Sequence, residues 1–491
     1  MKLELCGHDY KYAVEQILLM FFPSERPEYA PATGQGPSAR IALSEGETYV
    51  TAVTTLRWGG VHRGVARAET RSLGDRLERD RVLQRILKLS FYKAAVAATG
   101  TEPVWGALTG IRPGKLAEGY LRAGMRPERA ARELRRVYRV SPERAELSVR
   151  AAQESVRVED TLGPRDAAVY LGVPFCPTRC AYCSFVSHSV ERSMKLVAPF
   201  LDALEREIDA VGALARELGI RVVSVYFGGG TPTTLSAPEL RRVISRLQSS
   251  FDLSALREFT VEAGRPDTIT PEKLLALREG GVDRVSVNPQ TMSDRVLEAI
   301  GRRHTAGDVY RAMELVRAAG FSSVNMDLIA GLPEDSPAGF ADTLEKVLAL
   351  GPENVTVHTL SLKKGTRITL EGTAIPDGAQ VAEMLDTARA SLAGAGYAPY
   401  YLYRQKFMSG GFENVGWSLP GHENLYNVLI MEELCTILAL GGGGVTKLVA
   451  PSIGRIERVF NAKYPYEYIG SIDRELEAKE KIREFYRQNY M

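Results

Sequence analysis

Three cysteines within eight residues are the feature of this sequence with the clearest chemical meaning. Cys176, Cys180 and Cys183 are spaced C-x3-C-x2-C in the segment YLGVPFCPTRCAYCSF. Thiolate is the usual protein ligand of a cubane iron–sulfur cluster, and three thiolates leave one of its irons without a protein ligand. Such an open iron can bind a cofactor or a substrate directly. The spacing therefore predicts a [4Fe-4S] cluster with one open coordination site.

These cysteines also have two alternative roles. One is a Cys3His zinc site completed by His188, and in the other the three cysteines are unrelated to one another. Structural zinc sites usually combine two separated pairs of ligands, and this sequence contains no second pair of cysteines. The two remaining cysteines, Cys6 and Cys435, stand alone. A lone cysteine is most often a buried small residue.

Glycines and polar residues follow several predicted strands further along the chain. Gly228–Gly230 and Thr231 follow the second strand, Glu262 ends the third, Gln290 follows the fourth and Asp327 lies in the fifth. A glycine run lets a ligand approach the backbone closely, although a tight turn explains it equally well. A single polar side chain at a strand end is usually a cap or a solvated residue. Three of them on one rim are typical of a site that binds hydroxyl groups and a zwitterion.

The elements that must position these residues begin near residue 168. Short β-branched apolar runs alternate there with amphipathic helical stretches, which predicts a parallel sheet with crossover helices. The expected strands are 168–173, 222–227, 258–262, 284–288, 323–329 and 354–360. Six such units form either a partial barrel or an open doubly wound sheet, and the periodicity alone does not separate the two. In both, functional groups gather at the C-terminal ends of the strands.

The composition shifts along the chain predict three regions. The first is an N-terminal α+β and helical domain, with a hairpin and an Arg-rich helical run. That run is best explained as a solvated face, with a surface for a partner or an anionic ligand as the alternative. The last region is a C-terminal α+β extension that covers the barrel mouth and ends in a charged helix. In order, the regions are 1–163, 164–365 and 366–491; the hairpin is expected at 41–43 and 49–56, and the charged helix at 472–489.

Composition and charge narrow the functional classes. The chain has 491 residues, 45% of them hydrophobic, and a formal net charge of +2. A charge this small gives no global electrostatic reason to bind nucleic acid or an acidic membrane surface. The first residues, MKLELCGHDYKY, lack the apolar region of a signal peptide, and the apolar stretches are too short to span a bilayer. We therefore expect a soluble, cytoplasmic protein.

The cysteine segment resembles that of the radical S-adenosylmethionine (radical SAM) superfamily. More narrowly, residues 165–450 are similar to oxygen-independent coproporphyrinogen III oxidases and their heme-chaperone relatives. The similarity looks closest to the coproporphyrinogen dehydrogenase branch, which carries an extra N-terminal region. The resemblance implies a partial parallel (β/α)6 barrel of radical SAM type. It also implies one [4Fe-4S] cluster, whose open iron is chelated by the amino and carboxylate groups of SAM.

The resemblance assigns SAM-binding positions as well. Arg302 is expected to clamp the SAM carboxylate, a task suited to a guanidinium fork, and its neighbour Arg303 is the alternative. Tyr170 and Tyr182, which belong to this set, are equally well explained as aromatic residues of the core, and His358 is explained as a structural histidine. The implied SAM-binding residues are Tyr170, Tyr182, Gly228, Gly229, Gly230, Thr231, Glu262, Gln290, Arg302, Asp327 and His358. Arg404 and Lys406, in the segment after the barrel, are candidate partners for substrate carboxylates.

The implied reaction is the oxidative decarboxylation of coproporphyrinogen III propionates to vinyl groups, a step of heme biosynthesis. A 5′-deoxyadenosyl radical made from SAM would take hydrogen from a propionate β-carbon, and loss of CO2 and one electron would follow. The reaction requires a low-potential electron donor of flavodoxin or ferredoxin type and an electron acceptor.

The sequence also departs from its relatives near the expected substrate site. Gly172 stands where a histidine is common, and Leu425, Tyr426 and Asn427 stand where Arg-His-Asn is more frequent. Two alternative functions therefore stay open. One is a heme-binding chaperone, and the other is a radical SAM enzyme acting on heme or another tetrapyrrole.

Overall fold

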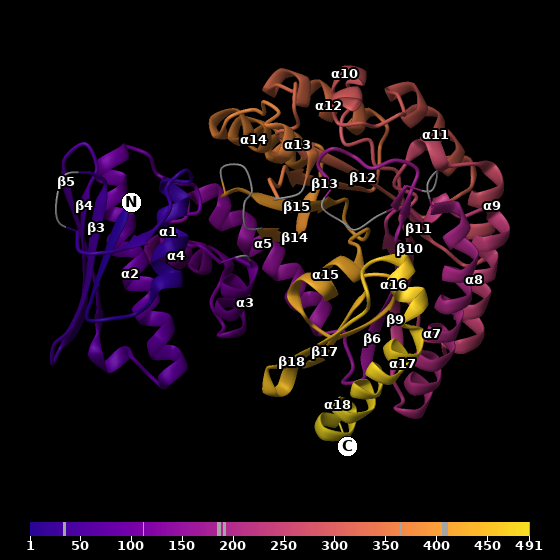
Figure 1. Cartoon of the computed structure of the whole chain (residues 1–491), viewed down its shortest axis with the longest axis horizontal. Coiled ribbons are helices and arrows are strands. Elements are labelled where there is room, and N and C mark those ends of the chain that lie inside the picture. Colours follow the sequence, from indigo (N-terminus) through magenta and orange to yellow (C-terminus); the bar gives the residue numbers. More distant parts are fainter. Residues whose placement is uncertain are drawn as a thin grey trace. The chain divides into compact units, whose positions relative to one another are not determined.

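The chain folds into two compact units, Met1–Val149 and Arg150–Met491 (Figure 1). The boundary lies inside helix α5 (Pro142–Glu159), and the second unit contains both the predicted barrel and the C-terminal extension. The computed structural model describes residues 1–32, 36–110, 112–183, 188–189, 193–363, 366–404 and 411–490. Within these ranges, no helix is both long enough and apolar enough to cross a membrane.

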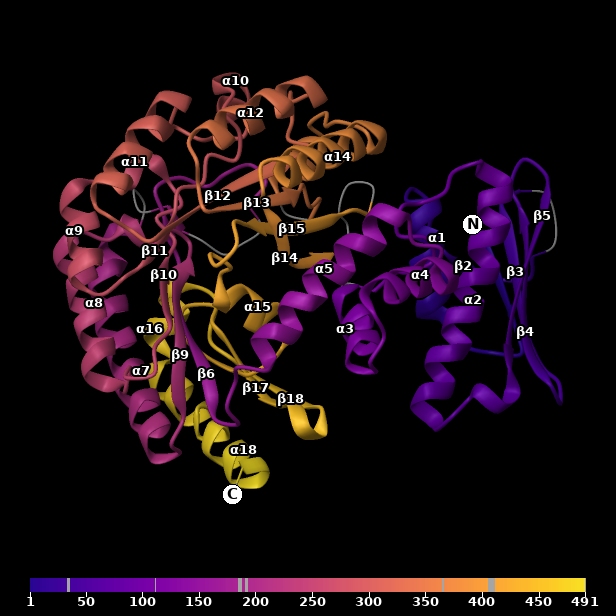
Figure 2. The ribbon, with the colours of Figure 1, turned by 180° about the vertical axis from the view of Figure 1, so that it is seen from behind.

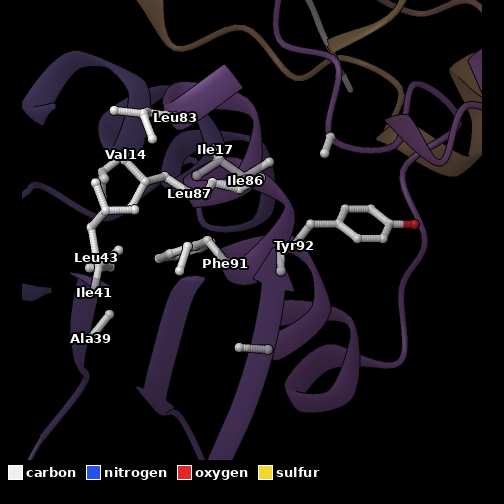
Figure 3. Close-up of a cluster of buried hydrophobic side chains, with 14 of the residues drawn as sticks. Val14, Ile17, Ala39, Ile41, Leu43, Leu83, Ile86, Leu87, Phe91 and Tyr92 are labelled. Carbon is white, nitrogen blue, oxygen red and sulfur yellow. The ribbon is translucent and has the colours of Figure 1, made fainter. Parts of the chain in front are cut away.

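The first unit contains a five-stranded sheet and its helices. The strand order is β2-β1-β3-β4-β5, with β1 parallel to β2 and β3 and the other neighbours antiparallel. Its core joins Ile17 of α1, Leu87 and Phe91 of α2, and Ile41 of β3, all of them buried (Figure 3). The elements are β1 (Lys2–Cys6), α1 (Lys11–Phe21), β2 (Glu28–Tyr29), β3 (Ser38–Glu45), β4 (Tyr49–Arg57), β5 (Val61–Glu69), α2 (Arg76–Thr99), α3 (Gly114–Arg122) and α4 (Pro127–Tyr138).

The second unit begins with alternating strands and helices that match the predicted pattern. Up to the end of the predicted barrel, its elements are β6 (Asp166–Val173), β7 (Phe175–Cys176), β8 (His188–Ser189), α7 (Val197–Glu217), β9 (Arg221–Gly229), α8 (Ala237–Ser250), β10 (Glu258–Val261), α9 (Pro271–Glu279), β11 (Arg284–Ser286), α10 (Asp294–Ala299), α11 (Ala306–Ala318), β12 (Ser323–Ala330), α12 (Pro337–Ala349) and β13 (Asn354–Thr359). The C-terminal elements are α13 (Arg367–Glu371), α14 (Gly378–Gly394), β14 (Ala398–Arg404), β15 (Glu413–Ser418), α15 (Leu425–Glu432), β16 (Thr436–Gly441), β17 (Val445–Ala450), β18 (Arg455–Phe460), α16 (Pro465–Gly470), α17 (Ile472–Ala478) and α18 (Glu480–Tyr490).

Six parallel strands form the centre of the large sheet. They follow one another in chain order, β6-β9-β10-β11-β12-β13, and every neighbouring pair is parallel. Helices α7, α8, α9, α11 and α12 lie on the outer side of the curved sheet in both views (Figures 1 and 2). A doubly wound sheet would reverse its strand order and carry helices on both faces. The arrangement is therefore the predicted partial (β/α)6 barrel.

C-terminal strands extend both edges of this parallel sheet. Strand β15 pairs antiparallel with β13 and then with β14, whereas β16 pairs parallel with β6 and continues into β17 and β18. The full order is β14-β15-β13-β12-β11-β10-β9-β6-β16-β17-β18. In the described part of the chain, no pairing joins β14 to β18, so the sheet is not closed by hydrogen bonds.

Side-chain caps fix where the crossover helices begin. Ser236, Thr270, Thr305 and Ser336 each precede a helix, and each side chain accepts a hydrogen bond from the backbone N–H three residues later. These N-caps satisfy donors that the first helical turn leaves unpaired. Each cap therefore fixes the residue at which its helix begins.

The charged C-terminal helix is interrupted at Lys479, between α17 and α18. Lys479 is fully buried, and its ammonium lies 3.0 Å from a carboxylate oxygen of Glu207, which is also fully buried. It also donates to the carbonyl of Ala439 at 2.8 Å and to Oδ1 of Asn461 at 2.9 Å. The single charged helix predicted at 472–489 is thus divided at a residue that supplies the counter-charge of the buried Glu207.

We expect Lys479→Met to destabilise the second unit by about 3–5 kcal/mol, because it leaves a buried carboxylate without its ionic partner. Urea unfolding followed by circular dichroism measures the change. The matched control is Lys481→Met, since Lys481 is exposed two residues further on. A surface substitution of this kind should change the free energy of unfolding by no more than about 0.5 kcal/mol. Equal effects of the two substitutions would contradict the role given to the buried ion pair.

Candidate functional site

A cavity of about 360 Å³ lies at the C-terminal ends of the barrel strands. Thirteen of the fourteen residues predicted to hold the cluster or SAM line it, and Gly228 is the exception. The predicted residues that line it are Tyr170, Cys176, Cys180, Tyr182, Cys183, Gly229, Gly230, Thr231, Glu262, Gln290, Arg302, Asp327 and His358. The fold thus brings together side chains that are spread over almost 190 positions of the sequence.

The three cysteines enter this cavity from the loop after β6. Cys180 is buried, whereas Cys176 and Cys183 are half-buried. The hydroxyl of Thr231 lies 3.6 Å from the sulfur of Cys176, and the backbone N–H of Cys183 donates to the carbonyl of Cys180 at 3.1 Å. The Thr231 contact therefore links the cysteine loop to the end of β9, while the bond from Cys183 to Cys180 forms a turn within the loop.

The cysteines are not arranged around the position of one metal ion. In the ranges that the structure describes, no group of three His, Cys, Asp or Glu side chains could hold a single ion. A single zinc ion needs all its ligands within about 2.3 Å of one point. A cubane cluster presents a separate iron to each thiolate, so its three ligands stand further apart. The side chain of His188, the fourth ligand in the zinc alternative, lies outside the described residues.

The glycine run at the end of β9 is required by the packing of the strands. Gly229 has a φ of +103°, and a Cβ atom there would lie 2.9 Å from the backbone nitrogen of Val173. A Cβ atom on Gly230 would overlap with the carbonyl of Phe175. Glycine is the only residue that avoids these contacts. The run thus keeps β9 close to β6 and leaves its backbone at the cavity wall.

Glu262 is a buried carboxylic acid at the end of β10. The hydroxyl of Tyr226 donates to its Oε1 at 2.5 Å. Burial raises the pKa of Glu262 to about 7, and the nearby charge of Asp327 adds to this rise. The rings of Tyr170 and Tyr426 stack on Tyr226, with centroids 6.3 and 4.4 Å away. Tyr170 is thus both a core aromatic and a cavity residue.

This raised pKa predicts how stability changes with pH. An unfolded chain ionises Glu262 above its ordinary pKa of 4.5, whereas the folded chain keeps it protonated up to about pH 7. Between these values the folded state binds more protons, so the free energy of unfolding falls as pH rises. In this pH range and without SAM, the free energy of unfolding of Glu262→Gln should rise relative to that of the wild type by about 1.4 kcal/mol per pH unit. Urea unfolding from pH 5 to 8 measures it, with the exposed Glu383→Gln as control; a constant difference would contradict the assignment.

Asp327 differs from Glu262 because its surroundings favour the ionised form. Although burial acts to raise its pKa, His358 and hydrogen bonds from Asn325 and Thr356 hold the pKa of Asp327 below its ordinary value. The side-chain nitrogen of Asn325 lies 2.7 Å from Oδ1, and Nε2 of His358 lies 3.8 Å from Oδ2. At neutral pH the cavity thus carries one ionised carboxyl group, Asp327, and one that is about half protonated, Glu262.

Gln290 has an unusual backbone conformation on the same rim. Its φ is +69°, which non-glycine residues adopt rarely and at a cost of about 1–3 kcal/mol. The strain is maintained by two hydrogen bonds to β12: the N–H of Gln290 donates to Asp327, and its carbonyl accepts from Ile329. These contacts hold the buried Gln290 side chain at the cavity wall.

Arg302 extends its guanidinium group into the cavity lining. Its Nη1 donates to the carbonyl of Asn288 at 2.8 Å, and its Nη2 donates to the hydroxyl of Tyr182 at 2.9 Å. Its Nε and the Oδ1 of Asn288 are buried and have no hydrogen-bond partner among the described residues. Within the same part of the chain, no carboxylate forms an ion pair with Arg302. A bound carboxylate and a donor group would satisfy these atoms, so the cavity fits a zwitterionic ligand such as the methionine part of SAM.

Arg404, one of the two predicted substrate residues, lies outside this cavity. Arg404 ends β14 and does not line the cavity. Its guanidinium donates to the carbonyl of Gly411 at 2.6 Å, and burial lowers the pKa of Arg404 to about 10. Lys406 lies outside the described residues. The contact of both residues with substrate carboxylates stays a prediction.

Several cavity residues were missed by the sequence reasoning. Two of them are cations, Arg265 and Lys363, and the others add hydroxyl, amide and apolar groups. The additional lining residues are Thr178, Gly264, Arg265, Asn288, Ile329, Thr359, Leu360, Ser361, Lys363, Tyr403 and Asn414. Arg265, three residues after Glu262, could have been identified as a further polar residue at the end of the third strand. Tyr403 and Asn414 come from strands whose pairing the sequence did not predict.

Comparisons with known proteins agree with this site. The family model of the Radical SAM superfamily matches residues 170–347. Oxygen-independent coproporphyrinogen-III oxidase-like protein HemZ of Bacillus subtilis (strain 168) is 37% identical over 438 residues, covering 87% of this chain and 86% of that protein. Heme chaperone HemW of Escherichia coli (strain K12) is 26% identical over 328 residues, covering 66% of this chain and 82% of that protein. The solved structure of coproporphyrinogen III oxidase (HemN) from Escherichia coli superposes with a TM-score of 0.52 at 22% identity, covering 66% of this chain and 73% of that one.

The fold and the three-cysteine cavity therefore define a radical SAM enzyme, a class whose cofactors are one [4Fe-4S] cluster and SAM. The matched segment begins at Tyr170 in β6 and ends in α12, so it contains the cysteines and every predicted SAM residue except His358. Within this superfamily, the chain belongs to the family of oxygen-independent coproporphyrinogen III oxidase-like enzymes.

Proposed function

We propose that this enzyme converts propionate side chains of coproporphyrinogen III to vinyl groups without oxygen. The observation that carries the proposal is the single cavity lined by the three cysteines, Arg302, Glu262 and Asp327. The relatives support a tetrapyrrole substrate, because the names of both HemZ and HemN refer to coproporphyrinogen III oxidation. A heme-binding chaperone is the second candidate, because the chain is also similar to HemW.

Different residues of the cavity would bind the cluster and SAM. Cys176, Cys180 and Cys183 would each bind one iron of the cluster. When bound, the cluster and SAM supply a hydrogen-abstracting radical that no amino-acid side chain provides. Arg302 has no ion-pair partner among the described residues, and its guanidinium group would bind the SAM carboxylate. Gly228–Gly230 would bring backbone close to the methionine part of SAM.

The carboxyl groups and neighbouring apolar residues would hold the rest of SAM. Asp327 is ionised and can accept hydrogen bonds from ribose hydroxyls, while protonated Glu262 can also donate one. Gln290 and the backbone near Tyr182 and His358 would complete the contacts. Ile329, Leu360 and Tyr170 line the cavity with apolar surface that would exclude water from the reacting atoms.

The substrate would enter from the side of the C-terminal region. We propose Arg404 and Lys406 as partners of its propionates, together with Lys363, which lines the cavity. A charge-assisted hydrogen bond contributes about 1.5–3 kcal/mol, so each paired propionate would add substantially to affinity. A flavodoxin or ferredoxin type donor would reduce the cluster.

The decisive experiment is an anaerobic incubation of the reconstituted enzyme with coproporphyrinogen III, SAM, dithionite and an added electron acceptor for the substrate radical. We expect vinyl product, CO2 and 5′-deoxyadenosine, with product formation that requires all four components. A parallel titration with heme tests the second candidate. Stoichiometric heme binding together with no vinyl product would reject the proposed reaction in favour of the chaperone, while deoxyadenosine formed only with heme would indicate a heme-modifying enzyme.

A further inference from the structure

Arg265 is a buried arginine that contacts the cysteine loop directly. Its side chain is 4% exposed, and Nη1 donates to the sulfur of Cys180 at 3.4 Å. Nη2 donates to the hydroxyl of Thr178 at 2.8 Å, two residues before that cysteine. The third nitrogen, Nε, donates to a carboxylate oxygen of Asp267 at 3.2 Å. All three guanidinium nitrogens are thus engaged, two of them with the loop that would hold the cluster.

The backbone around Arg265 fixes this geometry. The residue follows β10 on the cavity rim, and its carbonyl accepts hydrogen bonds from both the N–H and the hydroxyl of Thr268, at 2.9 and 2.8 Å. A short 3-10 turn (Pro266–Thr268) begins at the next residue. The arginine therefore extends from a hydrogen-bonded turn, which restricts the positions that its side chain can take.

The charge of Arg265 is only partly offset by its surroundings. Asp267 contacts it through a single nitrogen, and the Asp267 side chain is 24% exposed, which weakens the pairing through solvent screening. His304 packs beside the same groups, and its pKa is lowered to about 4 by burial and by the charges of Arg302 and Arg265. At neutral pH this histidine carries no charge. The surroundings of Cys180 are therefore positive.

We propose that Arg265 is a positioning residue that raises the reduction potential of the cluster through its hydrogen bond to the Cys180 thiolate. Hydrogen bonds to the ligand sulfurs and nearby charge are known to set cluster potentials. Reduction adds one electron, taken from a low-potential donor, and makes and breaks no bond. A buried cation next to a ligand sulfur stabilises the added negative charge, so the reduced state is favoured.

The test is a redox titration of the reconstituted full-length enzyme, followed by electron paramagnetic resonance of the reduced cluster. Relative to wild type, Arg265→Gln should lower the equilibrium constant for reduction at least tenfold, which is a shift of about 59 mV to lower potential. Arg265→Lys keeps the charge and should give a smaller shift in the same direction. The matched control is Arg284→Gln. Arg284 is also buried and hydrogen-bonded, but it lies at the opposite ends of the strands, at the start of β11, and should leave the potential unchanged.

Two results would overturn the inference. One is an Arg265→Gln enzyme with full cluster content and the wild-type reduction potential. This result would show that Arg265 only holds the cysteine loop in place. If that variant does not keep its cluster, Asp267→Asn is measured instead. It removes the partner that offsets Arg265 and should raise the potential; an unchanged potential there is the second contrary result. The inference rests on the proposed cluster site, but a failure of that site is distinguishable, because the wild-type chain would then take up no cluster at all.

Discussion

Replacing Cys176, Cys180 or Cys183 with alanine is expected to abolish assembly of the iron–sulfur cluster. Anaerobically reconstituted wild-type protein should contain about four irons and four sulfides per chain, whereas each variant should contain almost none. The reason is that a three-thiolate site has no spare protein ligand, so removing one thiolate leaves a second iron unprotected. Iron and acid-labile sulfide analysis measures the loss, together with the absorbance of the cluster.

The chain provides a matched control for this experiment in Cys435. Cys435 is buried in the hydrophobic core directly before β16, and it does not line the cavity. Burial raises the pKa of its thiol to about 12. Cys435→Ala should therefore load a full cluster. Stoichiometric zinc without labile sulfide in the anaerobically purified wild-type protein would refute the cluster assignment and favour the zinc alternative.

Replacing Arg302 with methionine is expected to weaken SAM binding roughly tenfold to a hundredfold while leaving the cluster intact. A hydrogen bond to a charged group contributes about 1.5–3 kcal/mol, which corresponds to this range of affinity. Methionine preserves much of the side-chain volume, so the Tyr182 ring keeps a neighbour. Binding of SAM to the reconstituted protein, measured by equilibrium dialysis under anaerobic conditions, gives the affinity directly.

Arg303 allows a direct comparison, because it is the next residue and was the alternative partner for the SAM carboxylate. It is exposed and does not line the cavity. Arg303→Met should therefore bind SAM as wild type does. If the Arg303 variant loses affinity and the Arg302 variant does not, the assignment of the two arginines must be exchanged.

The barrel was predictable because each of its strands and helices has a local signal. The strand predicted at 354–360 begins at the observed residue and ends one residue later than observed. The buried runs are rich in β-branched residues, and capping residues such as Ser236 mark the helix starts. The site residues followed from the barrel, since strand ends converge on one rim wherever crossovers repeat.

Features that depend on contacts between distant segments were not predictable in this way. Strand β5 was missed because its buried face carries Gly64, Ala66 and Ala68 in place of large apolar residues. A Cβ atom on Gly64 would overlap with the backbone of Ser90 in α2, so close helix packing requires these small residues. Similarly, Arg265 has no sequence feature that points to Cys180, because their contact depends on the path of two separate loops.

The pairing of both sheet edges with C-terminal strands has a consequence for biosynthesis. Strand β6 needs β16, which begins at Thr436, and β13 needs β15, which begins at Glu413. While the chain is being translated, the outer edges of both strands remain without partners until most of the protein has left the ribosome. Unpaired edges are templates for aggregation, and contacts this distant in sequence form slowly. The nascent chain therefore passes through a long interval in which a largely complete barrel still has two unpaired edges that can aggregate.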